Sequence, residues 1–155
     1  MLVGEVVSIN ISAGGVPKRP VHKVLVTVHG LAGDRQRNLQ HHGGPQRALC
    51  VYSADLLDAL RDEGHGVVPG ATGENLTVRG VAWDAMTVGT RFRAGTVEAE
   101  VTAYADPCHN LRPYFVDGRV GRIAQKAHPG WSRVYARVLV EGELVVGAPF
   151  ELLGP

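Results

Sequence analysis

The stretch "TVEAEVTAY", residues 96–104, carries the clearest structural pattern in the chain. Small apolar residues alternate with polar ones along it, so one predicted face carries Val97, Ala99, Val101 and Ala103. A period of two is typical of a half-buried antiparallel strand. The stretch "SRVYARVLV", residues 132–140, repeats this alternation with Val134, Ala136, Val138 and Val140. Both stretches therefore predict a sheet that covers a core with one face.

Three other stretches also have the spacing of strands, and they lie at 4–12 ("GEVVSINIS"), 24–28 ("VLVTV") and 47–53 ("RALCVYS"). The second and third are continuous in apolar residues, so we expect them to be buried on both faces. The sequence "EGE", 141–143, predicts a hairpin turn into "LVVGAPFELL".

The clearest helix is predicted to follow Ser53, a residue type that favours the helix N-cap, and to end near Gly64. It spans Ser53–Glu63, and Leu56, Leu57 and Leu60 form one face. A second short helix is expected near Asn110, with Pro113 in its first turn. The pattern predicts a mainly β fold, a closed or nearly closed β-barrel with a few short helices, in one domain over residues 1–155.

Composition narrows the possible functions. The formal net charge is +1 over 155 residues, so we expect neither nucleic-acid nor membrane binding. The opening "MLVGEVVSINIS" has no basic region before an apolar run, so we expect no signal peptide and a cytoplasmic protein. In that reducing compartment the two cysteines, Cys50 and Cys108, are expected to be free thiols.

Common cofactor motifs are absent from the sequence. "GLAG" at 30–33 is not a dinucleotide fingerprint, and "GATGEN" lacks the lysine of a phosphate-binding loop. There is no CxxC and no HExxH zinc pattern. His41 and His42 are adjacent, so in a strand they would point to opposite faces and would not bind one ion together.

Three irregular stretches are the candidates for a site. Residues 33–49 form a long polar, glycine-rich loop, and such loops in compact domains are often functional. In "PGATGENLTV", 69–78, Gly70 and Gly73 can adopt positive φ and turn backbone amides toward an anion. Either loop could also be ordinary turn structure.

The third stretch is "YADPCHNL", 104–111. Pro107 has no backbone N–H and therefore ends the strand, which leaves Cys108 at the rim of the sheet. A thiolate is a nucleophile and a soft metal ligand, and His109 and Arg112 could stabilise it. Cys50, inside "ALCVY", is instead expected to be an inert core residue.

The ordered set "GDRQ", "HHGGPQRAL", "YS", "PGATGENLTV", "VGT", "DPC" and "YARVLVEGELVVG" resembles the MOSC family, named after the C-terminal domain of molybdenum-cofactor sulfurase. The resemblance covers nearly the whole chain and implies a β-barrel-like fold and molybdenum-cofactor (molybdopterin) chemistry. The family's cysteine falls on Cys108, which the resemblance makes the molybdenum ligand and the catalytic residue.

The resemblance also implies a set of cofactor-binding residues in the two loops and after Cys108. They are Arg35, Gln36, His42, Gly43, Gly44, Arg47, Gly73, Glu74, Asn75 and Arg112. The arginines suit the cofactor's phosphate, because a guanidinium binds it with a bidentate fork. Some bacterial members have an arginine before the Pro-Cys pair, where this chain has Ala105 and Asp106, which leaves the charge around Cys108 undefined.

Two functions follow from the resemblance, and a third needs no cofactor. The first is a reductase of small N-hydroxylated compounds, which would need a separate electron-donor protein. The second is a non-catalytic carrier of molybdenum cofactor, or of sulfur as a persulfide on Cys108. The third is a β-domain used for protein contacts. Pyridoxal phosphate is not expected, because the sulfurase's desulfurase domain is missing and the chain has three lysines, Lys18, Lys23 and Lys126.

Overall fold

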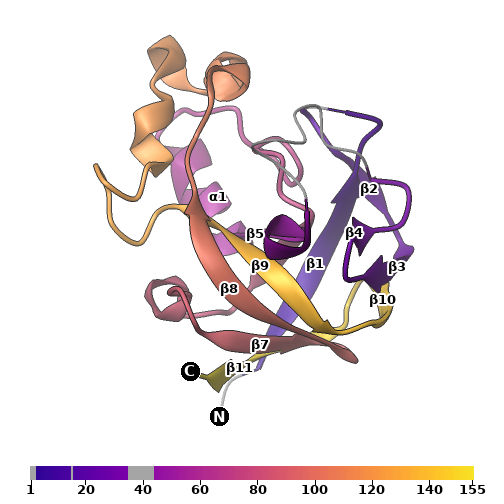
Figure 1. Cartoon of the computed structure of the whole chain (residues 1–155). Helices are drawn as coiled ribbons and strands as arrows, with labels where there is room; N and C mark the ends of the chain where they lie inside the picture. Colours follow the sequence, from indigo (N-terminus) through magenta and orange to yellow (C-terminus); the bar gives the residue numbers. More distant parts are fainter. Residues whose placement is uncertain (1–2, 15, 35–43) are drawn as a thin grey trace.

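A closed β-barrel forms the centre of the computed structural model, which describes residues 3–14, 16–34 and 44–155 (Figure 1). The strands of the ring are β1 (Gly4–Ile11), β5 (Leu49–Ser53), β6 (Leu76–Arg79), β7 (Arg91–Ala94), β8 (Val97–Ala105), β9 (Arg133–Val140) and β11 (Pro149–Gly154). Their order is β1, β6, β5, β9, β8, β7, β11, and the pairing of β11 with β1 closes the ring. The predicted barrel is therefore confirmed, with β5 and β6 as its parallel pair.

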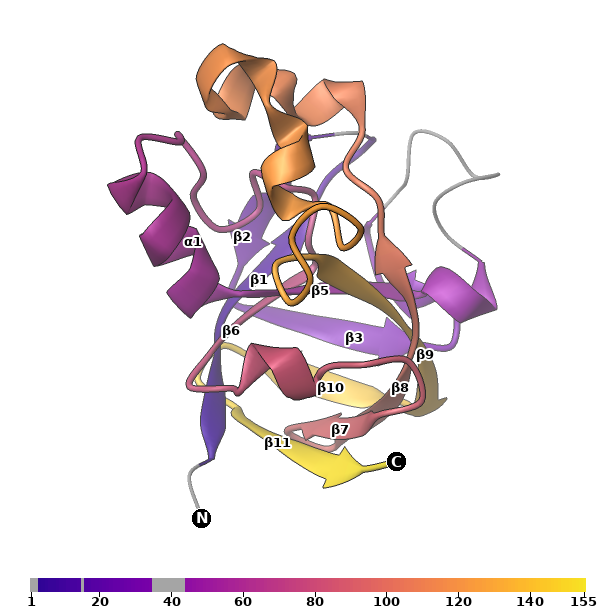
Figure 2. The ribbon, with the colours of Figure 1, turned by 90° about the vertical axis from the view of Figure 1, so that its left-hand side faces the viewer.

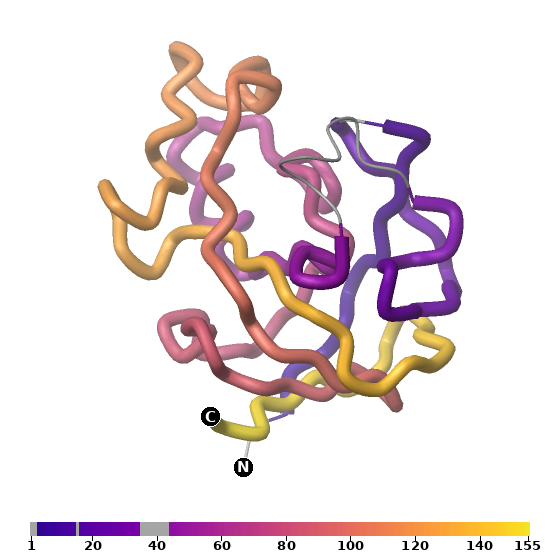
Figure 3. The backbone as a smooth tube through the Cα atoms, viewed as in Figure 1, coloured from indigo at the N-terminus to yellow at the C-terminus, as the bar shows by residue number. Residues whose placement is uncertain are grey.

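Shorter elements surround this ring. β2 (Arg19–Val21) pairs with β1, and a separate small sheet contains β10 (Gly142–Val145), β3 (Lys23–Thr27) and β4 (Gly30–Leu31). The helices are α1 (Ala54–Asp62) and the 3-10 turns η1 (Pro45–Arg47), η2 (Trp83–Ala85), η3 (His109–Tyr114), η4 (Val116–Gly118) and η5 (Val120–Ile123). The beginning of β1 and the C-terminus lie at the end of the barrel opposite η3–η5, as the tube in Figure 3 shows.

β8 follows the predicted alternation for most of its length. Val97, Ala99 and Val101 are buried in the main core, but Ala103 is not on their face. Val101 pairs with Ala136 and Ala103 with Tyr135, so Thr102 is an extra residue that bulges out of the ladder. The bulge turns Ala103 to the opposite face of the sheet, where the functional residues described below lie.

The helix predicted at Ser53 is confirmed as α1, the longest helix among the described residues. The Ser53 side chain caps it by accepting a hydrogen bond from the amide of Leu56 at 3.1 Å. Leu57 and Leu60 are buried against the barrel, as the apolar spacing predicted. In the part of the chain that the structure describes, no helix has the length and apolar character needed to cross a membrane.

The prediction for residues 24–28 was wrong. In β3 Val24 and Val26 are buried, but Leu25 between them is 51% exposed. β3 belongs to the small sheet, which covers the barrel with one face only, so alternate side chains point to solvent. By contrast β5, the other predicted buried strand, is buried at every position.

The hairpin predicted at "EGE" is also wrong. β9 ends at Val140 and β10 begins at Gly142, and β10 pairs with β3 rather than with β9. The single residue between them, Glu141, is too short for a hairpin loop, which needs at least two residues. The Glu141 carboxylate instead accepts a hydrogen bond from the amide of Val28 at 2.8 Å, which ties the chain to the β3 turn.

Candidate functional site

Cys108 stands where the chain leaves the barrel. β8 ends at Ala105, and the segment through Pro107 climbs to η3 at one end of the molecule (Figure 1). The Cys108 thiol is free and half-buried, and its residue is the N-cap of η3. The predicted strand end behind Pro107 and the short helix beyond it are therefore both present, but Pro113 lies near the end of η3 and not in its first turn, because the helix begins at His109.

Tyr135 on β9 lies at the centre of the surrounding cluster. It pairs with Cys50 on β5 and packs with Ala105, and the guanidinium of Arg47 lies 5.0 Å above its ring. Burial raises the pKa of its phenol, and the Cys50 thiol raises that pKa further. In decreasing order of strength, Arg133 and Arg47 lower this pKa and Cys108 raises it. One phenol thus connects β5, η1 and the strand end that carries Cys108.

The described ends of the 33–47 loop converge on the same part of the barrel. Asp34, at its beginning, accepts a hydrogen bond from the Asn75 side chain at 2.9 Å and pairs with Lys18 at 2.6 Å. Asn75 in turn accepts a hydrogen bond from the amide of Cys50 at 3.0 Å. At the other end, η1 carries Arg47 over Tyr135. Figure 2 shows η1 against the β8–β9 side of the barrel.

Arg133 is the residue that the sequence did not suggest. Its side chain is buried, with 4% of the residue exposed. Its guanidinium donates to the carbonyl oxygens of Thr72 at 2.6 Å, Ala105 at 3.2 Å and Asp106 at 3.0 Å. It therefore joins the 69–75 loop to the residues immediately before Pro107 and Cys108.

The charge of Arg133 is not neutralised within the described residues. No carboxylate forms an ion pair with it there, and its buried Nε has no hydrogen-bond partner. The three carbonyl oxygens replace part of the hydration of Arg133, but they carry no negative charge and leave its Nε unsatisfied, which keeps a cost of burial. An anion beside Arg133 would remove that cost.

The glycines of the loop Gly70–Asn75 adopt the expected positive φ, but the carboxylate of Glu74 forms its hydrogen bonds within the protein. Gly70 and Gly73 have φ of 88° and 83°. The Glu74 carboxylate is buried and accepts hydrogen bonds from the hydroxyls of Thr72 at 2.7 Å and Thr77 at 2.9 Å, and from the Gly70 amide. Burial raises its pKa, and these hydrogen bonds oppose the shift. In this structure Glu74 organises the loop from within.

The remaining predicted residues fall into two groups. Arg35, Gln36, His42 and Gly43 lie outside the described residues. Of the described ones, Gly44 begins η1 with φ of 78°, while Arg112 is exposed on η3 and its side chain packs along Gly118 of η4. The structure therefore brings Arg47 to the ring of Tyr135 and Asn75 to its pairing partner Cys50, whereas Arg112 lies beyond Cys108 on η3.

Cys50 behaves as the sequence predicted. It is 7% exposed in the middle of β5, and burial raises the pKa of its thiol to about 11, against a lowering influence from Arg133. Such a thiol is protonated near neutral pH and is a poor nucleophile. Of the two cysteines, Cys108 is therefore the one that chemistry can use.

The described residues offer a thiol and cations rather than a complete protein-made metal cage. Among them, no group of three or more histidine, cysteine or acidic side chains converges on one point. A half-buried thiol, in a chain segment whose preceding carbonyls bind the buried Arg133 guanidinium, suits a soft metal that arrives on an anionic organic ligand.

Comparison with known proteins identifies the family. Residues 38–151 match the sequence profile of the MOSC domain. The chain is 34% identical over 141 residues to YflK of Bacillus subtilis, covering 90% of this chain and 63% of YflK. It is 30% identical over 136 residues to YiiM of Escherichia coli, covering 84% of this chain and 59% of YiiM. The chain thus spans a little under two thirds of the length of these two relatives.

The fold agrees with that assignment. The crystal structure of YiiM from Geobacillus stearothermophilus superposes with a TM-score of 0.74 and 28% sequence identity, over 97% of this chain and 75% of that one. The profile match covers most of the chain and includes η1, the 69–75 loop and Cys108. The chain therefore belongs to the MOSC domain family.

Proposed function

We propose that this protein binds molybdenum cofactor, with Cys108 as the protein's ligand to molybdenum, and reduces small N-hydroxylated compounds. The observation that carries the proposal is the buried, unneutralised guanidinium of Arg133 at the strand end that presents Cys108. A thiolate is a suitable ligand for the cofactor's metal, and a guanidinium without an acidic partner is a suitable group to bind its phosphate.

The chain's own residues would divide the work of binding. Cys108 supplies the thiolate, and the turn after Pro107 holds it at the rim of the barrel, where it is half-buried. Arg133 and Arg47 supply positive charge near Tyr135 for the anionic parts of the cofactor. Asn75 ties the beginning of the 33–47 loop to β5 through its hydrogen bonds with Asp34 and Cys50, which orders this part of the site in advance.

When bound, the metal centre would supply the two-electron chemistry that removes oxygen from the substrate. The overall reaction converts an N–OH group, two electrons and two protons into an N–H group and water. No electron-transfer group belongs to the described fold, so the electrons would come from a separate donor protein. The role of this chain is binding, orientation and electrostatics.

A second candidate function uses the same thiol. Cys108 is half-buried whereas Cys50 is buried with a raised thiol pKa, so a persulfide would form at Cys108 in a sulfur or cofactor carrier. The carrier needs the thiol but no electron donor and no turnover.

One set of purified proteins separates the two functions. The wild type and Cys108→Ser are expressed in a molybdenum-sufficient host, and molybdenum, pterin fluorescence and sulfane sulfur are measured for each. The proposal predicts molybdenum and pterin in the wild type, and reduction of an N-hydroxylated test substrate with a reconstituted electron donor. Cys108→Ser should lose that turnover, because a protonated hydroxyl is a hard and poor replacement for a thiolate. A wild type that carries sulfane sulfur and no molybdenum would favour the carrier, and full turnover by Cys108→Ser would exclude the ligand assignment.

Arg133 provides a second, independent readout. Arg133→Met removes the charge at similar length, and Arg133→Lys keeps the charge without the planar fork. We expect pterin content per protein to fall at least about tenfold in Arg133→Met, with a partial loss in Arg133→Lys. Equal pterin content in both variants and the wild type would mean that Arg133 only clamps the backbone.

A further inference from the structure

A cavity lies on the opposite face of β8 from Tyr135 and Cys50. Its volume is about 220 Å³, and its walls come from η2, the end of β8 and residues 125–132. Ala103 and Ala105 pair with Tyr135 and Arg133, whereas Tyr104 between them pairs with Val134 and points the other way. The strand end that carries Cys108 therefore separates two different sites.

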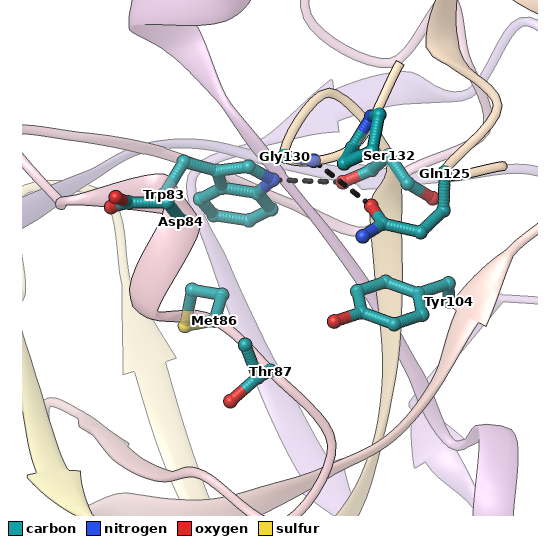
Figure 4. Close-up of a pocket in the computed structure, with 9 residues that line it drawn as sticks. Trp83, Asp84, Met86, Thr87, Tyr104, Gln125, Gly130 and Ser132 are labelled. Carbon is teal, nitrogen blue, oxygen red and sulfur yellow. Dashed lines mark hydrogen bonds between the residues drawn. The ribbon is translucent and has the colours of Figure 1, made fainter. Parts of the chain in front are cut away.

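Two aromatic rings form the main walls of this cavity, and Figure 4 shows them on either side of the space, with Met86 below Trp83. The Trp83 ring is fixed because its indole N–H donates to the carbonyl of Ser132 at 2.8 Å, and its edge packs on Tyr52 at 5.9 Å between ring centres. Tyr104 stands across from it, half-buried. Such walls offer the negative faces of π systems and a polarizable thioether.

The described lining of this cavity contains no lysine, arginine or histidine. Asp84 is the one charged residue among the lining residues of the described chain, and its carboxylate is turned outward in Figure 4. The other polar side chains, which belong to Thr87, Tyr104, Gln125 and Ser132, can donate as well as accept hydrogen bonds. The described lining therefore has no cation that would neutralise an anion, whereas its aromatic faces attract cations.

We propose that this cavity binds a small organic cation, such as an alkylammonium group, between Trp83 and Tyr104. Cations are attracted to the faces of tryptophan and tyrosine rings, and such aromatic walls are the usual receptor for quaternary ammonium groups. Asp84 adds a negative charge nearby, with its carboxylate turned away from the space between the two rings. The volume equals that of about seven water molecules at about 30 Å³ each, which suits a compact cation rather than a long chain.

The cavity and the proposed metal site share the backbone of β8, which carries Tyr104 and then leads on to Cys108. Binding in the cavity does not require the cofactor, so the proposal stands or falls separately from the proposed function. It can be tested on the purified apo protein.

The test uses two probes of the same shape and different charge. Choline carries a trimethylammonium group, and 3,3-dimethylbutan-1-ol is its neutral isostere. The chain has two tryptophans, so the two indole N–H resonances of ¹⁵N-labelled protein are assigned with Trp131→Phe. Choline should shift the Trp83 indole resonance with saturation in the millimolar range, and the neutral isostere should bind at least about tenfold more weakly.

Variants then locate the binding. Tyr104→Phe keeps the ring and should keep choline affinity within about threefold, while Tyr104→Leu should weaken it at least about fivefold. Asp84→Asn, on the exposed edge, should weaken it about two- to threefold in low salt. Equal binding of choline and its isostere would overturn the proposal in favour of a plain apolar pocket. Absence of any Trp83 shift with choline, or full affinity in Tyr104→Leu, would also overturn it.

Discussion

Cys50 gives the sharpest quantitative test of the site's geometry, because its reactivity follows from its burial in β5. The perturbation is Cys108→Ser, which leaves Cys50 as the one thiol in the chain. Burial raises the pKa of Cys50 from 9.0 to about 11. At pH 8 about one tenth of a thiol with pKa 9.0 is ionised and about one thousandth of a thiol with pKa 11, so the folded state should have about 100-fold less thiolate.

Part of that loss is offset. A more basic thiolate is a better nucleophile, and a Brønsted coefficient of about 0.4–0.5 over two pKa units returns about six- to tenfold. Ionisation alone therefore slows native Cys50 about tenfold relative to the same thiol in unfolded protein. Its 7% exposure adds a further factor, because the reagent must wait for local opening of the strand.

The assay compares the reaction of Cys108→Ser with a small disulfide reagent at pH 8, in buffer and in strong denaturant. The expected native rate is at least about tenfold below the unfolded rate after correction for denaturant. In the wild type, peptide mapping by mass spectrometry should find Cys108 labelled first. A native Cys50 rate within about threefold of the unfolded rate would refute both the burial argument and the assignment of Cys108 as the usable thiol.

Three further predictions concern the elements that hold the site. Glu74→Gln should change the pH dependence of stability, because burial raises the pKa of Glu74 in the folded state. The wild type has its full advantage below the unfolded pKa of about 4.5 and loses it as pH rises through the folded value, so chemical denaturation should show the wild type losing stability relative to Glu74→Gln as pH rises above about 4.5. Gly70→Ala should destabilise the protein by more than about 2 kcal/mol in the same measurement, because φ is 88° and the new Cβ would lie 2.4 Å from the carbonyl oxygen of Lys18; a loss within about 0.5 kcal/mol would contradict that close packing. Ser53→Ala should cost about 1 kcal/mol through loss of the hydrogen bond to the Leu56 amide, whereas Ser53→Asp should restore most of it.

Patterns of period two and 3.6 predicted most of the barrel, since they depend on neighbouring residues alone. β5, most of β8 and α1 could be predicted for that reason. The failures have a different origin. Pairing of β10 with β3 joins residues far apart in the chain, and the bulge at Thr102 adds one residue without changing composition. Neither leaves a local signal, yet the bulge decides which face Ala103 joins.

The candidate site was predictable as a set of loops but not as a set of contacts. Cys108 behind Pro107 and the glycines of the 69–75 loop could be identified from the sequence, because proline and glycine have specific effects on the backbone. The sequence did not indicate Tyr135, because it lies between apolar positions of β9 and the alternation predicts a surface residue there. It is buried because η1 covers that face, and no local pattern reports which segment covers an outer face of a sheet.

Arg133 shows how a charge can be supplied from another strand. The resemblance to the family gave reason to look for an arginine directly before the Pro-Cys pair, and this chain has Ala105 and Asp106 there. In the structure the guanidinium of Arg133 binds the carbonyl oxygens of those same two residues from the neighbouring strand. Its position depends on the register that pairs Ala105 with Arg133, and a slip of one residue would turn Arg133 to the face of Tyr104. The bulge at Thr102 sets that register, so the contact of Arg133 with the end of β8 is fixed by a backbone irregularity three residues before the strand ends.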